Sequence, residues 1–165
     1  MANLNQLLER LSDSDVEFVV VGGFAAMLHG SALITRDLDI CAVVSPATVS
    51  QLRAALADLH PTHRFTPQRL NFLKVPAEGV EVRNLYLETD LGPVDVLGSI
   101  LGIGDFKDVR NRAVEIEVLG RKCRLISLED LITAKEAVGR DKDKLAAKEL
   151  RAIAAKRAQQ AGGQS

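Results

Sequence analysis

Two aspartates set one residue apart in an apolar stretch are the residues of this chain best placed to do chemistry. Asp37 and Asp39 stand within TRDLDICAVV, and the two-residue period of a strand would turn both side chains away from Leu38 and Ile40. Their Cα atoms should lie roughly 7 Å apart, from a rise of about 3.3 Å per residue. Two such charges repel each other and lose hydration in an apolar strand, and a bound divalent ion commonly offsets both costs. The spacing therefore predicts that Asp37 and Asp39 bind magnesium.

A third carboxylate interrupts a later apolar run. Asp95 lies within GPVDVL, and residues 85–89 and 94–97 flank a turn, which predicts a hairpin. Three carboxylates on one sheet face could hold two metal ions about 3.5 to 4 Å apart, an arrangement suited to phosphoryl transfer. A lone aspartate on a half-exposed strand can also face solvent, so the residues alone leave both interpretations of Asp95 open.

The turn and helix that precede the acids are of a kind that can bind an anion. A hydrophobic run over residues 18–21 stops at Gly22 and Gly23, and residues 24–29 indicate a short helix closed by Gly30. A residue without Cβ allows close backbone approach, and the start of a helix presents its positive end. Gly22 and Gly23 are therefore candidates for phosphate binding, although a glycine pair after a strand is often only a turn.

Three further side chains are candidates for nucleotide binding. Ser31 and Arg36 fall in the loop before the acids and could contact a nucleotide, although loop hydroxyls and surface arginines often have no such role. Ser127 and Asp130 form a potential capping box that predicts the start of a helix, and Lys135 lies on the apolar stripe of that helix. It either extends to solvent or meets a buried anion.

These motifs together resemble the nucleotidyltransferase superfamily that includes DNA polymerase β. Its members carry a Gly-Gly or Gly-Ser turn, then Asp-x-Asp, then a third acid on a later strand. The strings GGFAAMLHG and TRDLDI look closer to a prokaryotic branch of nucleotidyltransferase-like toxins and small antibiotic-modifying enzymes. The stretch LISLEDLITAKEAVGRDKDKLAAKEL is similar to a second block of the toxin-like branch, with a helical lysine and an Arg-x-Lys-Asp run. Arg140, Lys142 and Asp143 match that run, although a helix-capping charge cluster also explains them.

The resemblance implies a fold and residue roles. The fold would be α/β, a minimal nucleotidyltransferase fold with a mixed sheet, flanking helices and C-terminal helices. Asp37 and Asp39 would coordinate the metal on a nucleoside triphosphate and a second metal near the acceptor. Asp95 would ligate the second metal and take the proton of the acceptor hydroxyl. Gly22 and Gly23 would bring backbone N–H groups to the β- and γ-phosphates.

The resemblance also implies an activity. The chain would be a transferase that uses Mg²⁺ or Mn²⁺ to move a nucleoside monophosphate from a nucleoside triphosphate, such as ATP, to a hydroxyl, releasing pyrophosphate. The acceptor could be a tRNA end, a protein or a small antibiotic, and the toxin-like branch suggests a toxin–antitoxin pair with an antitoxin partner. The alternative from another class is a non-catalytic regulatory module that binds nucleotide or metal.

Composition supports a small α/β protein. With 165 residues, 47% of them hydrophobic, the chain can bury one compact core, so we expect one domain over residues 1–156 and a disordered tail over residues 157–165. No N-terminal apolar segment approaches signal-peptide or membrane length, so we expect no membrane association and a cytoplasmic location. Residues 1–106 hold 7 basic and 13 acidic side chains, and residues 107–165 hold 14 and 9. The basic C-terminal part could cover a triphosphate or a tRNA-like acceptor.

Further elements follow from periodicity and turn residues. We expect an amphipathic N-terminal helix and a helix that begins after Ser45 and ends before Pro61. We also expect a strand over residues 71–75, a hairpin formed by residues 113–119 and 123–126, and two C-terminal helices.

Overall fold

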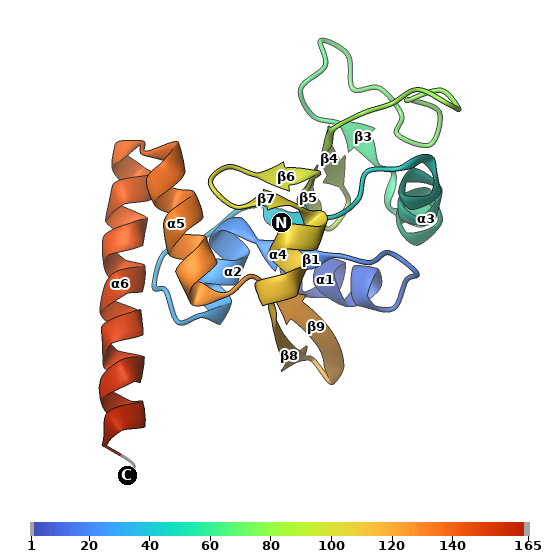
Figure 1. Ribbon diagram of the computed structural model, residues 1–165. Coiled ribbons are helices and arrows are strands. Elements are labelled where there is room, and N and C mark those ends of the chain that lie inside the picture. Colours follow the sequence, from blue (N-terminus) through green and yellow to red (C-terminus); the bar gives the residue numbers. More distant parts are fainter. Residues whose placement is uncertain (1, 164–165) are drawn as a thin grey trace.

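The candidate acids lie on a mixed sheet in the computed structural model, which describes residues 2–163 (Figure 1). The strands of this sheet are β1 (Val19–Val21), β2 (Leu38–Cys41), β3 (Thr62–His63), β4 (Asn84–Thr89), β5 (Gly92–Leu97), β8 (Val114–Val118) and β9 (Arg121–Leu125). Their order is β3-β4-β5-β2-β1-β9-β8. β2 pairs in parallel with β5, and β1 pairs in parallel with β9, whereas the other neighbours are antiparallel. A second, two-stranded sheet consists of β6 (Ser99–Ile100) and β7 (Gly104–Asp105).

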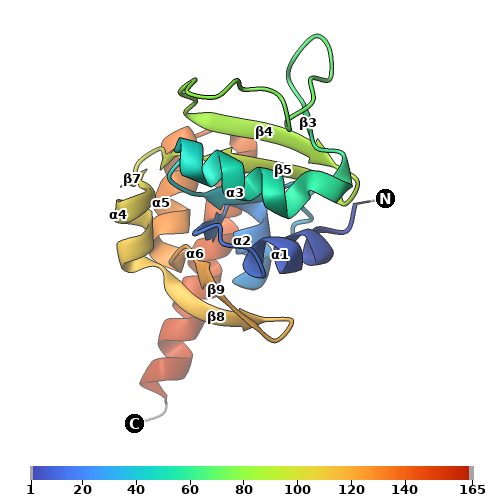
Figure 2. The ribbon, with the colours of Figure 1, turned by 90° about the vertical axis from the view of Figure 1, so that its right-hand side faces the viewer.

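Helices cover both faces of the large sheet. They are α1 (Leu4–Ser12), α2 (Gly22–Leu28), α3 (Pro46–Leu56), the 3₁₀ turn η1 (Ala57–Leu59), α4 (Phe106–Arg112), α5 (Leu128–Val138) and α6 (Asp141–Gly162). Figure 2 shows α1 and α3 in front of the sheet and α2, α5 and α6 behind it. The mixed sheet with flanking and C-terminal helices confirms the predicted α/β class.

Strand alternation separates an apolar face from a polar one. Leu38 of β2 pairs with Val94 of β5, which pairs with Leu87 of β4, and all three are fully buried. One residue along, Asp39 pairs with Asp95 and so points to the opposite face. The apolar face packs toward α1 and α3, and burying it fixes the register that aligns the acids, because a one-residue slip would expose it.

Several predicted elements are confirmed. The N-terminal helix buries Leu7, Leu8 and Leu11, and the side chain of Ser45 caps α3 at the backbone N–H of Thr48. The two expected hairpins form as β4–β5 and β8–β9, and the two C-terminal helices are α5 and α6. Local turn and capping residues therefore determine most element ends.

The predicted strand over residues 71–75 is wrong. The side chain of Asn71 accepts the N–H of Leu73, and its carbonyl accepts those of Lys74 and Val75, which forms a turn. Only an isolated bridge joins Asn71 to Thr62. The strand that does pair at this edge is β3, which the sequence did not indicate and which lies antiparallel to β4.

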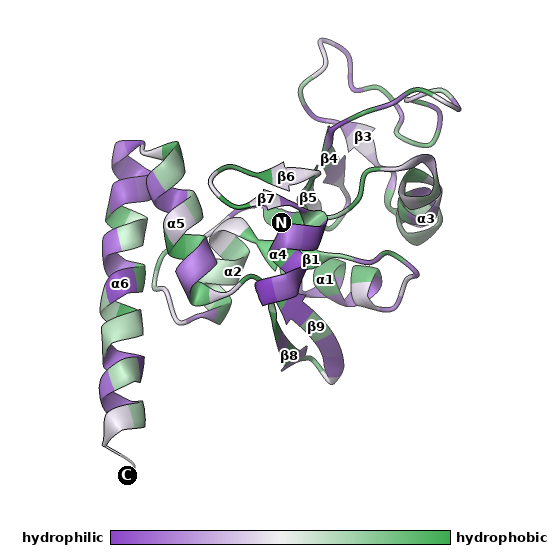
Figure 3. Ribbon diagram, viewed as in Figure 1, coloured by the Kyte–Doolittle hydropathy of each residue, from purple (hydrophilic) through white to green (hydrophobic). Residues whose placement is uncertain are grey.

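The last helix continues where we expected a tail. α6 runs to Gly162, and the guanidinium of Arg157 donates to the carbonyl oxygen of His29 at 2.8 Å. The final two residues of the expected tail lie outside the described residues. Figure 1 shows the C-terminal half of α6 extending past the sheet. Hydrophilic residues predominate on α4 and on much of the β8–β9 hairpin (Figure 3), and no described helix combines the length and apolar character needed to cross a membrane.

Candidate active site

Three neighbouring strands place a row of polar side chains across one face of the sheet. Asp39 of β2 pairs with Asp95 of β5, and Asp95 pairs with Tyr86 of β4. Asp37 stands immediately before β2 and joins them. One carboxylate oxygen from each of Asp37, Asp39 and Asp95 lies within 4.8 Å of the others. The structure therefore brings together the three acids that the sequence picked out.

The acids are partly withdrawn from water. Burial first, and then the charges of Asp95 and Asp37, raise the pKa of Asp39 to about 7. Burial also raises the pKa of Asp95, against the opposing charge of Arg64. Burial is thus the main factor that opposes ionisation of these two acids in the metal-free protein.

Two oxygen atoms of the cluster have no hydrogen-bond partner among the described residues. They are Oδ1 of Asp39 and Oδ1 of Asp95, and both are buried. A buried oxygen without a donor is costly, and carboxylate oxygens are the ligands that Mg²⁺ and Mn²⁺ prefer. The three acids thus fit a divalent cation in three respects: their ligand atoms are carboxylate oxygens, these atoms lie close together, and two oxygens of the cluster accept no hydrogen bond from any described residue.

Arg64 is a residue of the site that the sequence analysis missed. Its Nη1 lies 2.9 Å from Oδ1 of Asp95, and its Nη2 lies 3.8 Å from Oδ2 of Asp37. The backbone N–H of Arg64 donates to the carbonyl of Tyr86 at 2.8 Å, which fixes the residue beside β4. No signal in the sequence marks it, because its position depends on the pairing of β3 with β4.

Tyr86 is the second residue that was missed. It is the only tyrosine of the chain, it accepts a hydrogen bond from the side-chain amide of Asn84 at 3.3 Å, and its ring centroid lies 5.2 Å from that of Phe65. The alternation of residues 84–89 could have placed its side chain on the same face as Asp95.

The two glycines lie against the acid-bearing segment. Gly22 has φ +66°, and a Cβ built on it would collide with the carboxylate of Asp39. A Cβ on Gly23 would lie 2.8 Å from Oγ1 of Thr35. Close packing of the start of α2 on the acids therefore requires both glycines, and phosphate binding by their N–H groups stays a prediction.

A cavity of about 350 Å³ adjoins Asp39 between the sheet and α5. Gly22 and Tyr86 line it from the sheet side, and Lys135 lines it from α5. Many of the other lining side chains are apolar, among them Ile100, Leu101, Leu131 and Val138. A pocket with apolar walls, two basic side chains and carboxylates at its edge can accept a polar ligand that also carries a ring or an alkyl part.

The Arg-x-Lys-Asp run forms one end of this cavity. Asp143 is almost fully buried, and its carboxylate accepts a hydrogen bond from Nε of Arg140 at 2.6 Å. Nζ of Lys135 lies 3.8 Å from the same carboxylate. Lys142 is exposed. Arg140 and Asp143 thus hold the junction between α5 and α6 and position Lys135 beside the cavity.

Ser31 and Arg36 do not line the cavity. The hydroxyl of Ser31 donates to the carboxylate of Glu149, which also accepts the N–H of Ala32 at 3.0 Å, so Ser31 fastens its loop to α6. Arg36 is exposed. Their predicted contacts with a nucleotide stay predictions.

The expected capping box at the start of α5 forms only in part. The hydroxyl of Ser127 accepts the N–H of Asp130, whereas the carboxylate of Asp130 accepts a hydrogen bond from Arg112 at 2.8 Å.

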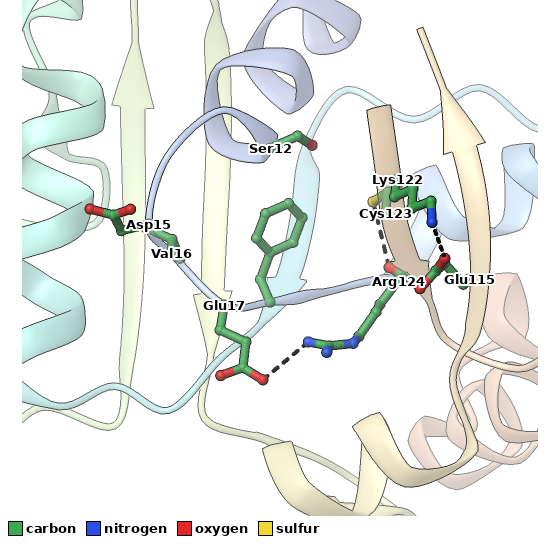
Figure 4. A pocket seen from close by; sticks show the side chains of 9 residues that line it. Ser12, Asp15, Val16, Glu17, Glu115, Lys122, Cys123 and Arg124 are labelled. Carbon is green, nitrogen blue, oxygen red and sulfur yellow. Dashed lines mark hydrogen bonds and ion pairs between the residues drawn. The ribbon is translucent and has the colours of Figure 1, made fainter. Parts of the chain in front are cut away.

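A separate cavity of about 370 Å³ lies between the segment after α1 and β9 (Figure 4). Glu17 and Arg124 form an ion pair of 3.1 Å at its edge, and Lys122 pairs with Glu115 at 3.6 Å. None of the three acids lines it, and Glu17, Glu115, Lys122 and Arg124 at its edge are already paired with one another. The candidate chemistry therefore belongs to the cavity beside Asp39.

Solved structures with the same fold include three nucleotidyltransferase-type proteins. The lincosamide antibiotic adenylyltransferase LnuA, in its lincomycin-bound form, has a TM-score of 0.59 at 18% identity, with 91% of this chain and 95% of that chain covered. A Thermotoga maritima protein with the provisional name nucleotidyltransferase has a TM-score of 0.54 at 19% identity, with 88% of each chain covered. The antibiotic-resistance factor ANT(2'')-Ia has a TM-score of 0.51 at 15% identity, with 96% and 91% covered.

These likenesses are low in sequence identity and show the fold. No curated protein sequence matches the chain at a significant level. The model of one protein family, described as "Nucleotidyltransferase of unknown function (DUF6036)", matches residues 1–152. Since that match covers nearly the whole chain and includes all three acids, the protein belongs to this family of nucleotidyltransferases.

Proposed function

We propose that the protein is a metal-dependent enzyme that transfers a nucleoside monophosphate from a nucleoside triphosphate to a hydroxyl acceptor. The observation that carries the proposal is the convergence of Asp37, Asp39 and Asp95 within 4.8 Å, with two of their buried oxygens accepting no hydrogen bond from any described residue. In the reaction the acceptor oxygen forms a bond to the α-phosphorus, and the bond from that phosphorus to the β-phosphate oxygen breaks. Pyrophosphate leaves, and the hydroxyl proton must go to a base.

Each acid has a role in this proposal. Asp37, Asp39 and Asp95 would hold Mg²⁺ or Mn²⁺, which when bound neutralises charge on the phosphates and acidifies the acceptor hydroxyl. Asp95 would also take the proton of the acceptor hydroxyl, the role that the resemblance to nucleotidyltransferases implies for the third acid. Asp37, at the end of the loop and more exposed than Asp95, would face the triphosphate.

The cavity supplies the groups that would position the triphosphate. Lys135 is the basic residue of α5 at the cavity, and its side chain is 22% exposed, so its charge is only partly screened by water. Gly22 would allow the phosphates to approach the backbone at the start of α2. Orientation of reactants and neutralisation of charge would then account for catalysis.

The acceptor class follows less directly from the site. LnuA is described as a lincosamide antibiotic adenylyltransferase and ANT(2'')-Ia as an antibiotic-resistance factor. We therefore place small hydroxyl compounds first among the acceptors to be tested. A tRNA end or a protein hydroxyl would instead agree with a toxin whose activity an antitoxin partner restrains.

Transfer of label from each α-³²P nucleoside triphosphate tests the proposal. The purified protein would be incubated with Mg²⁺ or Mn²⁺ and, separately, with hydroxyl-containing antibiotics, total RNA and total protein. We expect metal-dependent label on one acceptor class with the wild type and with Asp15→Asn, an exposed control, but not with Asp39→Asn or Asp95→Asn. Metal-dependent triphosphate binding without transfer to any acceptor would favour the non-catalytic module instead. Growth arrest that depends on Asp39 when the protein is expressed alone would support the toxin role.

A further inference from the structure

Arg64 occupies the mouth of the acid cluster. It contacts Asp95 and Asp37 at 2.9 and 3.8 Å, and only 14% of its side chain is exposed. A guanidinium so placed neutralises part of the charge of the cluster. It also takes up space between two of the carboxylates that would bind a divalent ion.

The compensation by Arg64 is incomplete. Its Nη1 donates to the carbonyl of Leu87 at 3.2 Å, and the contact with Oδ1 of Asp95 lacks hydrogen-bond geometry. Asp39, the most strongly perturbed acid of the three, is not among its ion-pair partners. Arg64 brings one positive charge to two of the three carboxylates, so the cluster still favours a cation of higher charge.

The side chain of Arg64 comes from a segment outside the helices and strands. Arg64 directly follows β3, and between β3 and β4 the structure describes neither a helix nor a strand. Its guanidinium stacks on Phe65 at 4.8 Å from the ring centroid, and Phe65 itself is 71% exposed. A rotation toward solvent would therefore break the hydrogen bond to Leu87 and the ion pairs with Asp95 and Asp37.

We propose that Arg64 is a built-in counter-ion of the acid cluster, and that a divalent metal ion must displace its guanidinium from Asp95 in order to bind. The proposal rests on the metal site of the proposed function and adds a competition to it. The arginine stabilises the metal-free protein and lowers its affinity for metal. Metal binding would free a positively charged side chain beside the acids, where it would be available to a phosphate group.

Binding of Mn²⁺ to the purified protein, followed by calorimetry, tests the competition. We expect Arg64→Gln to bind Mn²⁺ about tenfold more tightly than the wild type, since the displaced ion pair no longer opposes binding. Arg53→Gln is the matched control: Arg53 donates to the carbonyls of Phe72 and Pro76 in the same loop and is not an ion-pair partner of the acids. Its affinity for Mn²⁺ should equal that of the wild type.

A second signal comes from Tyr86. The chain has no tryptophan and only this tyrosine, which lies opposite Asp95 and beside Phe65. Its fluorescence should change as metal binds to the wild type, and the midpoint should shift in Arg64→Gln in step with the calorimetric affinity. Arg64→Lys covers the case in which the glutamine variant fails to fold. Lysine keeps the positive charge but lacks the planar guanidinium that reaches both carboxylates. The affinity of this variant for Mn²⁺ should therefore exceed that of the wild type by about two- to threefold.

Equal affinities of the wild type and Arg64→Gln would overturn the proposal and leave the metal site intact. Weaker binding by Arg64→Gln would also overturn it, because the arginine would then hold the acids in place for the metal. Tighter binding without any nucleotidyl transfer would support the competition and count against the proposed enzymatic function. Absence of Mn²⁺ binding by every variant would defeat both.

Discussion

Asp39 and Asp95 are direct neighbours in the parallel pairing of β2 with β5, and each buries its Oδ1 without a hydrogen-bond partner among the described residues. The pairing holds because the residues on either side of each aspartate, such as Leu38 and Val94, are fully buried on the opposite face. The apolar core thus forces two carboxylates together, at a cost in free energy that a cation would offset.

Replacing Asp39 by asparagine should separate stability from function. The amide has nearly the same shape but no charge, so we expect the metal-free protein at pH 8 to gain on the order of 1 to 3 kcal/mol in free energy of unfolding. Nucleotidyl transfer should fall at least about a hundredfold, because a metal ligand is lost. Urea denaturation and the label-transfer assay measure the two effects. A variant that loses stability and keeps activity would contradict the proposed role of Asp39.

The raised pKa of Asp39 predicts how stability depends on pH in the absence of metal. Its pKa is about 7 in the folded protein and 3.8 for an ordinary aspartate, so between these values the folded state binds one proton more than the unfolded state. The free energy of unfolding contributed by this group therefore falls as pH rises from about 4 to 7 and stays low above 7. Asp39→Asn should lack this component.

Urea denaturation at pH 5 and pH 8 in the presence of a chelator tests the pH prediction. The wild type should lose more stability than Asp39→Asn between the two values. Over the same window the affinity of the wild type for Mn²⁺ should increase with pH, because metal and proton compete for one carboxylate. A pH-independent difference between the two proteins would contradict the assignment of this titration to Asp39.

The sequence was sufficient to predict which faces of their strands the acids occupy, because that signal is local. Alternation in residues 37–41 and 92–97 places Asp39 and Asp95 on the faces opposite to apolar neighbours. In the structure the two strands are paired, with Asp39 opposite Asp95. Lys135 was found in the same way, from its place on an apolar helical stripe. The resemblance to nucleotidyltransferases added the link between the two strands, which periodicity alone does not supply.

Arg64 could not be found from the sequence, because its role depends on long-range pairing. β3 has only two residues, too few for a periodic signal, and its partner β4 lies about twenty residues later. The turn around Asn71 was mistaken for a strand because Phe72, Leu73 and Val75 are typical strand residues. Hydrogen bonding by the Asn71 side chain outweighed that preference.

Gly22→Ala tests whether the glycine turn is needed to hold the acids. A Cβ at this position would collide with the Asp39 carboxylate, and φ +66° already disfavours alanine. We expect a loss of about 2 to 4 kcal/mol in free energy of unfolding, together with loss of transfer activity. Gly79→Ala is the control, because Gly79 has φ +80° and open space around its Cβ position.

The control isolates the cost of the collision. Gly79→Ala carries only the backbone strain of about 1 kcal/mol and should leave transfer unchanged. Equal destabilisation by the two variants, with activity kept in both, would mean that Asp39 moves aside freely and that Gly22 has no special relation to the site.

Lys135→Met tests whether the cavity beside Asp39 receives the triphosphate. Methionine keeps the apolar stem of the side chain and removes the charge, while Arg140 continues to pair with Asp143 at 2.6 Å and so holds the junction of α5 with α6. We expect the KM for the nucleoside triphosphate to rise about tenfold, because a partly buried ammonium near phosphate oxygens contributes on the order of 1 to 2 kcal/mol to the free energy of binding. Thermal stability should change little. Lys142→Met, on the exposed side of α6, should leave KM unchanged. A rise in KM with Lys142→Met but not with Lys135→Met would place the triphosphate outside this cavity and would transfer its binding to the exposed basic residues of α6.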